Sequence, residues 1–415
     1  MMEKNLYFYL FLCVQVFTAL LGGYYLFIYT IGLFPWRRKE EGAFKKYLKF
    51  AVLIPAHDEE SVIENLINNL KELEYPKGFY EVIVIADNCN DNTAKLAKEA
   101  GAIVWERREP SKRGKQYALD WAFRRIIKEG KYDAVCVFDA DNLVSLNFLN
   151  RVNEKILSGE KVVQCYLDTK NPFDSWITKA YALGYWISNR VFQLARYRVG
   201  FSAVLGGTGF AISIDLLEKY ALGLTSLTED LELTVKLNLA GIKIGWLHDV
   251  KVYDEKPLTF RDSWNQRLRW MRGHWSVALK YGLSLLKKTF LEGKLFMLDM
   301  FFYAISPLRI LLGGLILLFL FLSHVSDVNV VSLPYPGVLP FWFWFAVSLW
   351  IWLYPFLALL QERVPIKAFP YMVYLVLWSL TWIPLVVQAL LTVRVRQWSH
   401  TKHTRALSFK EVNKV

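Results

Sequence analysis

Cysteine is scarce in this chain of 415 residues, and its four cysteines have no spacing typical of a disulfide framework or a zinc site. Three of them, Cys89, Cys136 and Cys165, fall in the middle of the chain. We therefore expect reduced, mostly buried thiols. The chain also lacks a nucleic-acid-binding motif, and its formal net charge of +12 is spread along the sequence. Nucleic acid is therefore not an expected partner.

Charged residues make up only 21% of the chain, and the apolar excess lies at its two ends. Residues 6–34 are nearly uncharged and long enough to cross a hydrocarbon core of ~30 Å. The run is too long for a signal peptide, and no small-x-small cleavage site follows it. Arg37, Arg38 and Lys39 come next, so we predict an N-terminal transmembrane helix with the following residues in the cytosol, near anionic lipids.

Three more apolar segments are long enough to span a membrane: residues 296–322, 339–360 and 368–391. The first connection, 323–340, has no Lys or Arg and suits an external loop, whereas the second, 361–367, is basic and suits the cytosol. The tail from Arg394 is also basic. Three crossings would leave that tail outside, so either one segment is interfacial or re-entrant, or the tail breaks the charge rule.

Three polar residues of this C-terminal part stand out. Arg309 lies near the inner end of its apolar segment, where contact with lipid is costly, so we expect it to face protein or a polar path. His400 and His403 have a spacing that could bind a metal. Two lone ligands on a basic tail are more typical of solvated side chains, and we expect both histidines to be solvated.

Between the apolar ends, short buried strands alternate with amphipathic helices. Strands are predicted at 50–55, 81–86, 102–105 and 134–138, with a helical pattern after each of the first three. This alternation indicates an α/β domain with a mostly parallel sheet covered on both faces.

Carboxylates follow three of these strands. Asp139 and Asp141 come directly after the strand 134–138, where ligands bind in open α/β sheets, and paired carboxylates suit Mg²⁺ or Mn²⁺ that holds phosphates. Asp87 ends another strand and is a ligand candidate. Asp58 and Glu59 open a helix, where they either complement the helix dipole or hydrogen-bond a ribose or base.

Three further motifs allow both a structural and a functional interpretation. Lys115 follows Gly114 at a helix start without the full P-loop pattern, so it contacts a diphosphate or belongs to a solvated basic face. Ser226 and Glu229 form a candidate capping box, which leaves a catalytic role open for Asp230. The glycines at 206, 207 and 209 form a tight turn or let backbone approach a sugar.

The stretch 260–281 has the pattern of an amphipathic helix. Trp264, Leu268, Met271 and Trp275 share one face at helical spacing, and basic residues occupy another. Such a helix next to membrane segments is typical of a membrane interface. It can also present residues 266–270 to the cleft.

Taken in order, these motifs resemble the membrane-integrated family 2 glycosyltransferases, the group of cellulose, chitin, hyaluronan and poly-N-acetylglucosamine synthases. The matching elements extend over residues 50 to 275: Asp58-Glu59, Asp87, Gly114-Lys115, Asp139-Ala-Asp141, Gly206-Gly-Thr-Gly209, Thr228-Glu229-Asp230 and Gln266-Arg-Leu-Arg269-Trp270. The last two motifs of this series, taken together, are highly specific for the family.

The resemblance implies a GT-A (Rossmann-like) domain and inverting transfer from a UDP-sugar. Asp230 would be the general base, and Asp139 and Asp141 would hold Mg²⁺ or Mn²⁺. The donor-binding residues would be Asp58, Glu59, Asp87, Lys115 and Arg269, with Asp87 reading uracil. The acceptor-binding residues would be Gly207, Thr208, Glu229, Gln266 and Trp270.

The expected function is transfer of a hexose or N-acetylhexosamine to a growing β-linked polysaccharide at the cytosolic face of the plasma membrane, with export by a multi-pass chain. The alternative is a non-processive glycolipid synthase, similar to ceramide or diacylglycerol glucosyltransferases, with a lipid acceptor. The expected division is an anchor at 1–40, a catalytic domain at 41–258, interfacial helices at 259–295, membrane helices at 296–393 and a basic tail at 394–415.

Overall fold

The computed structural model describes residues 2–35, 46–325, 341–395, 403 and 405–412. In these residues eight strands form one mixed sheet in the order β3-β2-β1-β4-β7-β6-β8-β5. The strands are β1 (Phe50–Ala56), β2 (Tyr80–Asp87), β3 (Ile103–Arg107), β4 (Ala134–Val137), β5 (Leu143–Val144), β6 (Val162–Thr169), β7 (Phe210–Ser213) and β8 (Gly245–Asp254).

The first half of the sheet is parallel, as predicted. β1 pairs in parallel with β2 and β4, and β2 pairs in parallel with β3. The second half is mixed, because β7 runs antiparallel to both β4 and β6, whereas β8 pairs in parallel with β6. The C-terminal ends of β1, β2 and β4 therefore meet at one edge, which β8 joins from the mixed half.

Helices cover both faces of the sheet, and a large apolar cluster lies on each side. One cluster packs Leu53, Ile85 and Val137 against α4, and the other packs Ile54, Val84 and Cys136 against α2. Cys89, Cys136 and Cys165 are free and buried, as expected. The helices of this part are α2 (Ile63–Lys71), η1 (Lys77–Phe79), α3 (Thr93–Glu99), α4 (Lys115–Glu129), α5 (Phe148–Leu157), α6 (Trp176–Ser188), η2 (Asn189–Leu194), α7 (Ala195–Arg198), α8 (Ile214–Leu216), η3 (Leu217–Ala221) and α9 (Glu229–Leu239).

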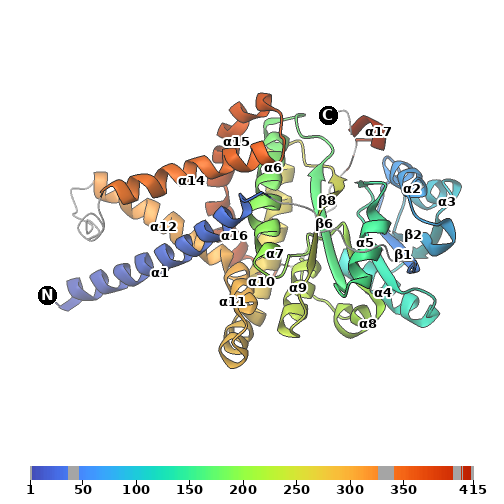
Figure 1. Cartoon of the computed structure of the whole chain (residues 1–415), viewed down its shortest axis with the longest axis horizontal. Helices are drawn as coiled ribbons and strands as arrows, with labels where there is room; N and C mark the ends of the chain where they lie inside the picture. The colour runs from blue at the N-terminus through green and yellow to red at the C-terminus, as the bar shows by residue number, and fades with distance from the viewer. Residues whose placement is uncertain (1, 36–45, 326–340, 396–402, 404, 413–415) are drawn as a thin grey trace.

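The remaining helices except α17 lie to one side of the sheet, and α1, α12 and α14 extend away from it, whereas α17 lies near α2 (Figure 1). Their bounds are α1 (Met2–Gly32), α10 (Phe260–Glu292), α11 (Leu295–Ala304), α12 (Ser306–Val325), α14 (Phe341–Gln361), η4 (Ile366–Tyr371), α15 (Met372–Leu380), α16 (Trp382–Leu391) and α17 (Phe409–Val412).

By length and composition, the described residues contain one helix able to cross a membrane, Ile366–Leu391. A second candidate is the pair Leu295–Ala304 and Ser306–Ile316, which is bent by 57° at its break, as a broken span or a re-entrant loop would be. The bend lies within the segment 296–322, which we predict to span the membrane. A re-entrant segment here would be one way for the basic tail to lie on the cytosolic side. The number of crossings stays a prediction.

The long helix α10 begins where the amphipathic pattern begins, because the Thr259 hydroxyl accepts a hydrogen bond from the Asp262 N–H and caps its first turn. Its apolar stripe packs against α16, where Trp275 contacts Val386 and Ala389. The indole N–H of Trp264 also donates to Gln388 Oε1 over 2.9 Å. α16 therefore covers this part of the stripe, and the placement of α10 at a membrane interface stays a prediction.

Candidate active site

A single cleft at the C-terminal edge of β1, β2 and β4 gathers most of the predicted residues. α4, α9, α10 and the C-terminal tail complete its walls. The lining includes His57, Glu59, Asp87, Lys115, Asp139, Asp141, Tyr185, Gly207, Thr208, Glu229, Asp230, Asp254, Glu255, Gln266, Arg269, Trp270 and His403.

Asp87 ends β2 at one end of this cleft. Its Oδ1 accepts hydrogen bonds from the Arg107 guanidinium at 2.5 Å and from the Asn88 amide at 2.9 Å. Its backbone oxygen lies 2.7 Å from His57 Nδ1. These contacts hold a buried carboxylate in one orientation, as recognition of a polar ligand edge requires.

Asp58 and Glu59 have different surroundings. Asp58 is not among the cleft-lining residues; it has a positive φ of 54°, and its Oδ1 accepts a hydrogen bond from the Asn90 N–H over 2.7 Å. Glu59 is buried, and its carboxylate oxygens lie 2.9 and 3.0 Å from His403 Nδ1. Asp58 therefore shapes the loop, while Glu59 faces the cleft.

Asp58 also belongs to a cluster with Cys89 and Asp91, whose ligand-type atoms lie within 4.8 Å of one another. The carboxylate oxygens of Asp91 accept hydrogen bonds from the backbone N–H groups of Glu60 and Thr93. These bonds connect the start of α3 to the loop after β1, so the cluster has a structural explanation.

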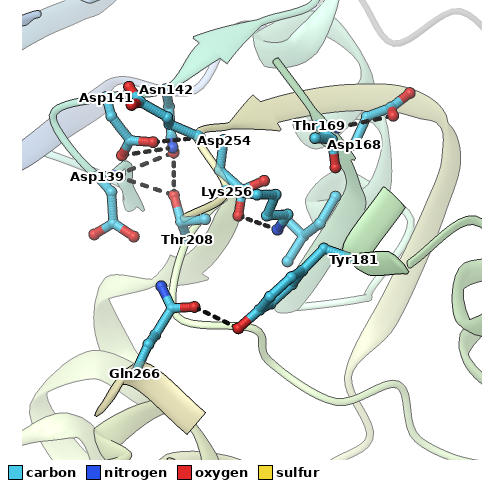
Figure 2. Close-up of polar contacts among 12 residues, drawn as sticks. Asp139, Asp141, Asn142, Asp168, Thr169, Tyr181, Thr208, Asp254, Lys256 and Gln266 are labelled. Carbon is cyan, nitrogen blue, oxygen red and sulfur yellow. Dashed lines mark hydrogen bonds and ion pairs between the residues drawn. The ribbon is translucent and has the colours of Figure 1, made fainter. Parts of the chain in front are cut away.

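The loop after β4 carries the predicted metal ligands. The Asp139 N–H donates to Asn142 Oδ1 and Thr208 Oγ1 over 3.1 and 3.0 Å (Figure 2). The Thr208 hydroxyl in turn donates to Asn142 Oδ1. Because that hydroxyl is buried in this network, we assign Thr208 to positioning the loop rather than to contact with an acceptor.

A third carboxylate, Asp254, stands beside this loop at the end of β8 (Figure 2). Burial raises the pKa of Asp254 to about 6; Lys256, at 2.6 Å, lowers it and the charge of Asp141 raises it. Asp254 Oδ1 is buried and has no hydrogen-bond partner in the described part of the chain. Asp139, Asp141 and Asp254 line the same cleft, and carboxylate oxygens are the ligands that Mg²⁺ and Mn²⁺ prefer.

Lys115 lies at the first turn of α4 and reaches across to Asp139. Its Nζ contacts the Asp139 carboxylate and lies 2.9 Å from the backbone oxygen of Gly207. Burial lowers the pKa of Lys115, but the charges of Asp139, Glu229 and Asp230 and the hydrogen bond to Asp139 together outweigh it, so the net pKa is raised. Lys115 is therefore a cation held next to the loop that carries Asp139 and Asp141.

Asp230 lies in the first turn of α9 and also lines the cleft. Burial and the charge of the neighbouring Glu229 raise the pKa of Asp230 to about 7, although Lys115 and Arg269 oppose the shift. Its Oδ1 accepts a hydrogen bond from the Leu231 N–H over 2.8 Å. A carboxylate that titrates near neutrality at the wall of a cleft has the property required of a general base.

The capping box predicted from Ser226 and Glu229 is wrong. α9 begins at Glu229, and its N-cap residue is Thr228, whose side chain makes no capping hydrogen bond within the described residues. Glu232 instead accepts hydrogen bonds from the N–H groups of Thr225 and Ser226, each over 2.8 Å. Because Glu232 holds the turn, the helix start leaves Glu229 and Asp230 facing the cleft.

The wall next to Asp230 is formed by α10 and by the glycine turn. Gln266 Oε1 accepts a hydrogen bond from the Tyr181 hydroxyl over 3.0 Å (Figure 2), and Trp270 lies edge-on to the same ring. Gly207 has a φ of +82°, and a Cβ there would lie 3.4 Å from Asp230 Oδ2. Glycine at this position therefore allows the backbone to approach the Asp230 carboxylate closely.

Sequence reasoning missed Arg107, Tyr185, Asp254, Glu255 and His403. Asp254 follows the same rule as Asp139, since it ends a strand that reaches the cleft edge, and recognition of β8 would have found it. The expectation that His403 is solvated is wrong, because His403 is mostly buried against Glu59. His400 lies outside the described residues.

The Rossmann-like mixed sheet, with a carboxylate-lined cleft at the ends of its parallel strands, is typical of a GT-A type glycosyltransferase. The profile of the family described as "Glycosyltransferase like family 2" matches residues 48–273, more than half of the chain. The chain belongs to this family.

Curated relatives share this region. A "Probable glycosyltransferase YdaM" of Bacillus subtilis is 29% identical over 62% of either chain. A beta-monoglucosyldiacylglycerol synthase of Trichormus variabilis is 32% identical over 57% of this chain and 51% of its own. A poly-beta-1,6-N-acetyl-D-glucosamine synthase of Staphylococcus aureus is 28% identical over 57% of either chain. The matches thus span half to about three fifths of these relatives.

Among solved structures, a mannosyltransferase of Pyrobaculum calidifontis in complex with GDP-Man and Mn²⁺ has the same fold. The TM-score is 0.62 at 17% identity, and the match covers 92% of this chain and 97% of the other.

Proposed function

We propose that this chain is an inverting glycosyltransferase that moves a hexose or N-acetylhexosamine from a UDP-sugar to an acceptor hydroxyl. The observation that carries the proposal is one cleft with two kinds of acid. Asp139, Asp141 and Asp254 line it and would bind a cation, and Asp230, whose pKa is raised to about 7 by burial and by Glu229, lines it as well.

Asp230 and the cation-binding residues have different roles in the proposed reaction. Asp230 accepts the proton of the acceptor hydroxyl as its oxygen attacks the anomeric carbon from the side opposite the diphosphate, so one displacement inverts the configuration. Asp87 and Glu59 face the nucleoside end of the donor. Lys115 and Arg269 stabilise the negative charge that grows on the departing diphosphate.

Asp139, Asp141 and Asp254 would hold a divalent metal. When bound, Mg²⁺ or Mn²⁺ would add positive charge next to the diphosphate. The donor set of oxygen ligands favours these hard cations over zinc.

For the acceptor we propose a β-linked polysaccharide. The indole of Trp270 lines the cleft on the same side as Asp230, and an aromatic ring there offers a platform on which an acceptor sugar can stack. The poly-N-acetylglucosamine synthase relative supports this choice.

A glycolipid acceptor is the second candidate, and two observations favour it. The relative with 32% identity is a beta-monoglucosyldiacylglycerol synthase. In addition, the described residues contain one helix able to span a membrane, or two with the bent pair, which is few for a polymer channel. For either acceptor we propose a multi-pass protein of the plasma membrane with the cleft in the cytosol.

One experiment tests donor and acceptor together. The purified full chain is given Mg²⁺ or Mn²⁺ with radiolabelled UDP-sugars, with GDP-mannose as a control donor, and with or without lipid, and the products are sized. We expect a polymer from one UDP-sugar. A single sugar on lipid overturns the polymer proposal, turnover of GDP-mannose alone overturns the UDP assignment, and no turnover of any donor overturns the enzyme proposal.

A further inference from the structure

Glu232 is the third acid in the first turn of α9, after Glu229 and Asp230. Unlike those two, it is not among the residues that line the cleft. Its side chain is only 2% exposed, and an ionised carboxylate is costly to bury unless hydrogen bonds compensate it. A buried acid outside the cleft, two residues from the proposed base, needs an explanation of its own.

Donors from two parts of the chain surround the Glu232 carboxylate. Its Oε2 accepts hydrogen bonds from the N–H groups of Thr225 and Ser226, in the turn before α9. Its Oε1 accepts hydrogen bonds from Lys280 Nζ over 2.7 Å and from the Tyr281 hydroxyl over 2.8 Å, both on α10. Burial raises the pKa of Glu232, but these hydrogen bonds outweigh it, so the pKa is lowered and the carboxylate is ionised at neutral pH. One charged group therefore joins the start of α9 to α10.

A second contact joins the same turn to α10. A Cβ at Gly273 would lie 2.8 Å from the Thr228 backbone nitrogen, which is too close for any residue other than glycine. The Ser226 hydroxyl also donates to the backbone oxygen of Gly273 over 3.4 Å. Leu231 of α9 and Val277 of α10 belong to one buried apolar cluster, and the two helices lie side by side (Figure 1). The start of α9 is therefore held against α10 by polar and apolar contacts.

The two helices carry different parts of the site. α9 carries Asp230, and α10 carries Gln266 and Trp270, all of which line the cleft. The proposed transfer requires the base within hydrogen-bond reach of the acceptor hydroxyl, so the rate depends on how α9 lies against α10. We propose that Glu232 is a positioning residue for the transfer reaction, which fastens the start of α9 to α10 and so fixes Asp230 relative to the bound acceptor. The inference rests on the proposed function, since it takes Asp230 as the base.

The test compares kcat with UDP affinity, because a residue that positions the base affects the first and not the second. The full chain in detergent is assayed for transfer of radiolabel from UDP-glucose and UDP-N-acetylglucosamine with Mg²⁺, and is titrated with UDP, as wild type, Glu232→Gln and Lys280→Met. We expect kcat to fall about tenfold or more in Glu232→Gln and about threefold in Lys280→Met, with UDP affinity and the donor KM unchanged. Lys287→Ala, at another exposed lysine of α10, is the control and should match wild type.

A double variant shows whether the two side chains act as one contact. If Lys280 acts through Glu232, then Glu232→Gln/Lys280→Met should have the same kcat as Glu232→Gln alone, because the lysine has no carboxylate left to hold. Losses that multiply in the double variant mean that the two residues act separately, which overturns the inference.

Three other results also overturn it. A wild-type kcat in Glu232→Gln with a lower thermal midpoint means that Glu232 only stabilises the fold. Equal losses of kcat and UDP affinity mean that it acts on the donor site. If Glu232→Gln does not fold, Lys280→Met decides, because its half-exposed side chain contributes little to stability, and an unchanged kcat there refutes the inference. Wild type that transfers no sugar overturns the proposed function as well, which is a distinct result because it precedes any variant.

Discussion

The pair of Glu229 and Asp230 predicts a specific pH dependence. Burial and the charge of Glu229 raise the pKa of Asp230 to about 7. A general base acts in its deprotonated form, so kcat/KM should rise with pH and level off above an apparent pKa near 7. Because the two carboxylates interact, this apparent pKa belongs to the pair.

Glu229→Gln removes the neighbouring charge. Two unit charges separated by roughly 7 Å interact by about 2 kcal/mol at an effective dielectric constant of about 20, which corresponds to about 1.5 pKa units. Lys115 and Arg269 remain and favour the ionised form of Asp230. The rising limb of the profile should therefore move to lower pH by about one unit.

The assay is the initial rate at low donor concentration between pH 5 and 9, with saturating metal. Glu229→Gln can also lower the maximal rate, but a lower maximum does not shift the pH at which the rate rises. Glu218→Gln, on an exposed turn, is the matched control and should keep the wild-type limb. A limb that stays in place, or moves to higher pH, in Glu229→Gln would refute the assignment of Asp230 as the titrating base.

Three further predictions follow from single contacts. Asp230→Asn should lower kcat by about 10² to 10⁴ and keep UDP affinity within about twofold. The same variant should have a higher thermal midpoint than wild type at pH 8 but not at pH 3.5, because the raised pKa of Asp230 in the folded state lowers stability only above the unfolded pKa of about 3.9. Asp254→Asn should raise the Mn²⁺ concentration for half-maximal activity about tenfold or more, measured by metal titration, and an unchanged value would exclude it as a ligand. Gly207→Ala should destabilise the fold by roughly 1 kcal/mol, measured by denaturant unfolding, because its φ is +82°; equal stability would show that the turn relaxes.

The sequence predicted the parallel half of the fold because that half obeys local rules. The runs at β1, β2 and β4 are continuously apolar, as strands buried on both faces are, and polar residues follow where they end. Asp87 and Asp139 were recognisable for that reason. In the mixed half the sequence predicts a strand at 161–167, which is β6, but not the pairing of this half, since β5 is only two residues long and β7 returns antiparallel.

The partners of α10 could not be predicted from its own pattern. An apolar stripe on a helix has the same sequence whether lipid or another helix covers it. Here α16, more than a hundred residues later, provides the cover. Likewise, the composition of residues 226–232 fits a capping box, but Glu232 binds the turn instead, and only the fold decides between two acidic residues three positions apart.

The charge of the cleft explains why its last component comes from the far end of the chain. Four of its carboxylates, Glu59, Asp87, Asp139 and Asp141, lie in the first 141 residues, and such a group is costly to keep ionised in one partly buried place. Two cations of the lining, Arg113 and Lys115, lie in the same stretch of the chain as these acids. Arg269 and His403 arrive with α10 and the C-terminal tail, so the electrostatic balance that a diphosphate needs depends on packing of the C-terminal part. The region matched to the family, 48–273, therefore contains the proposed base and the proposed metal ligands, while His403 lies 130 residues beyond it.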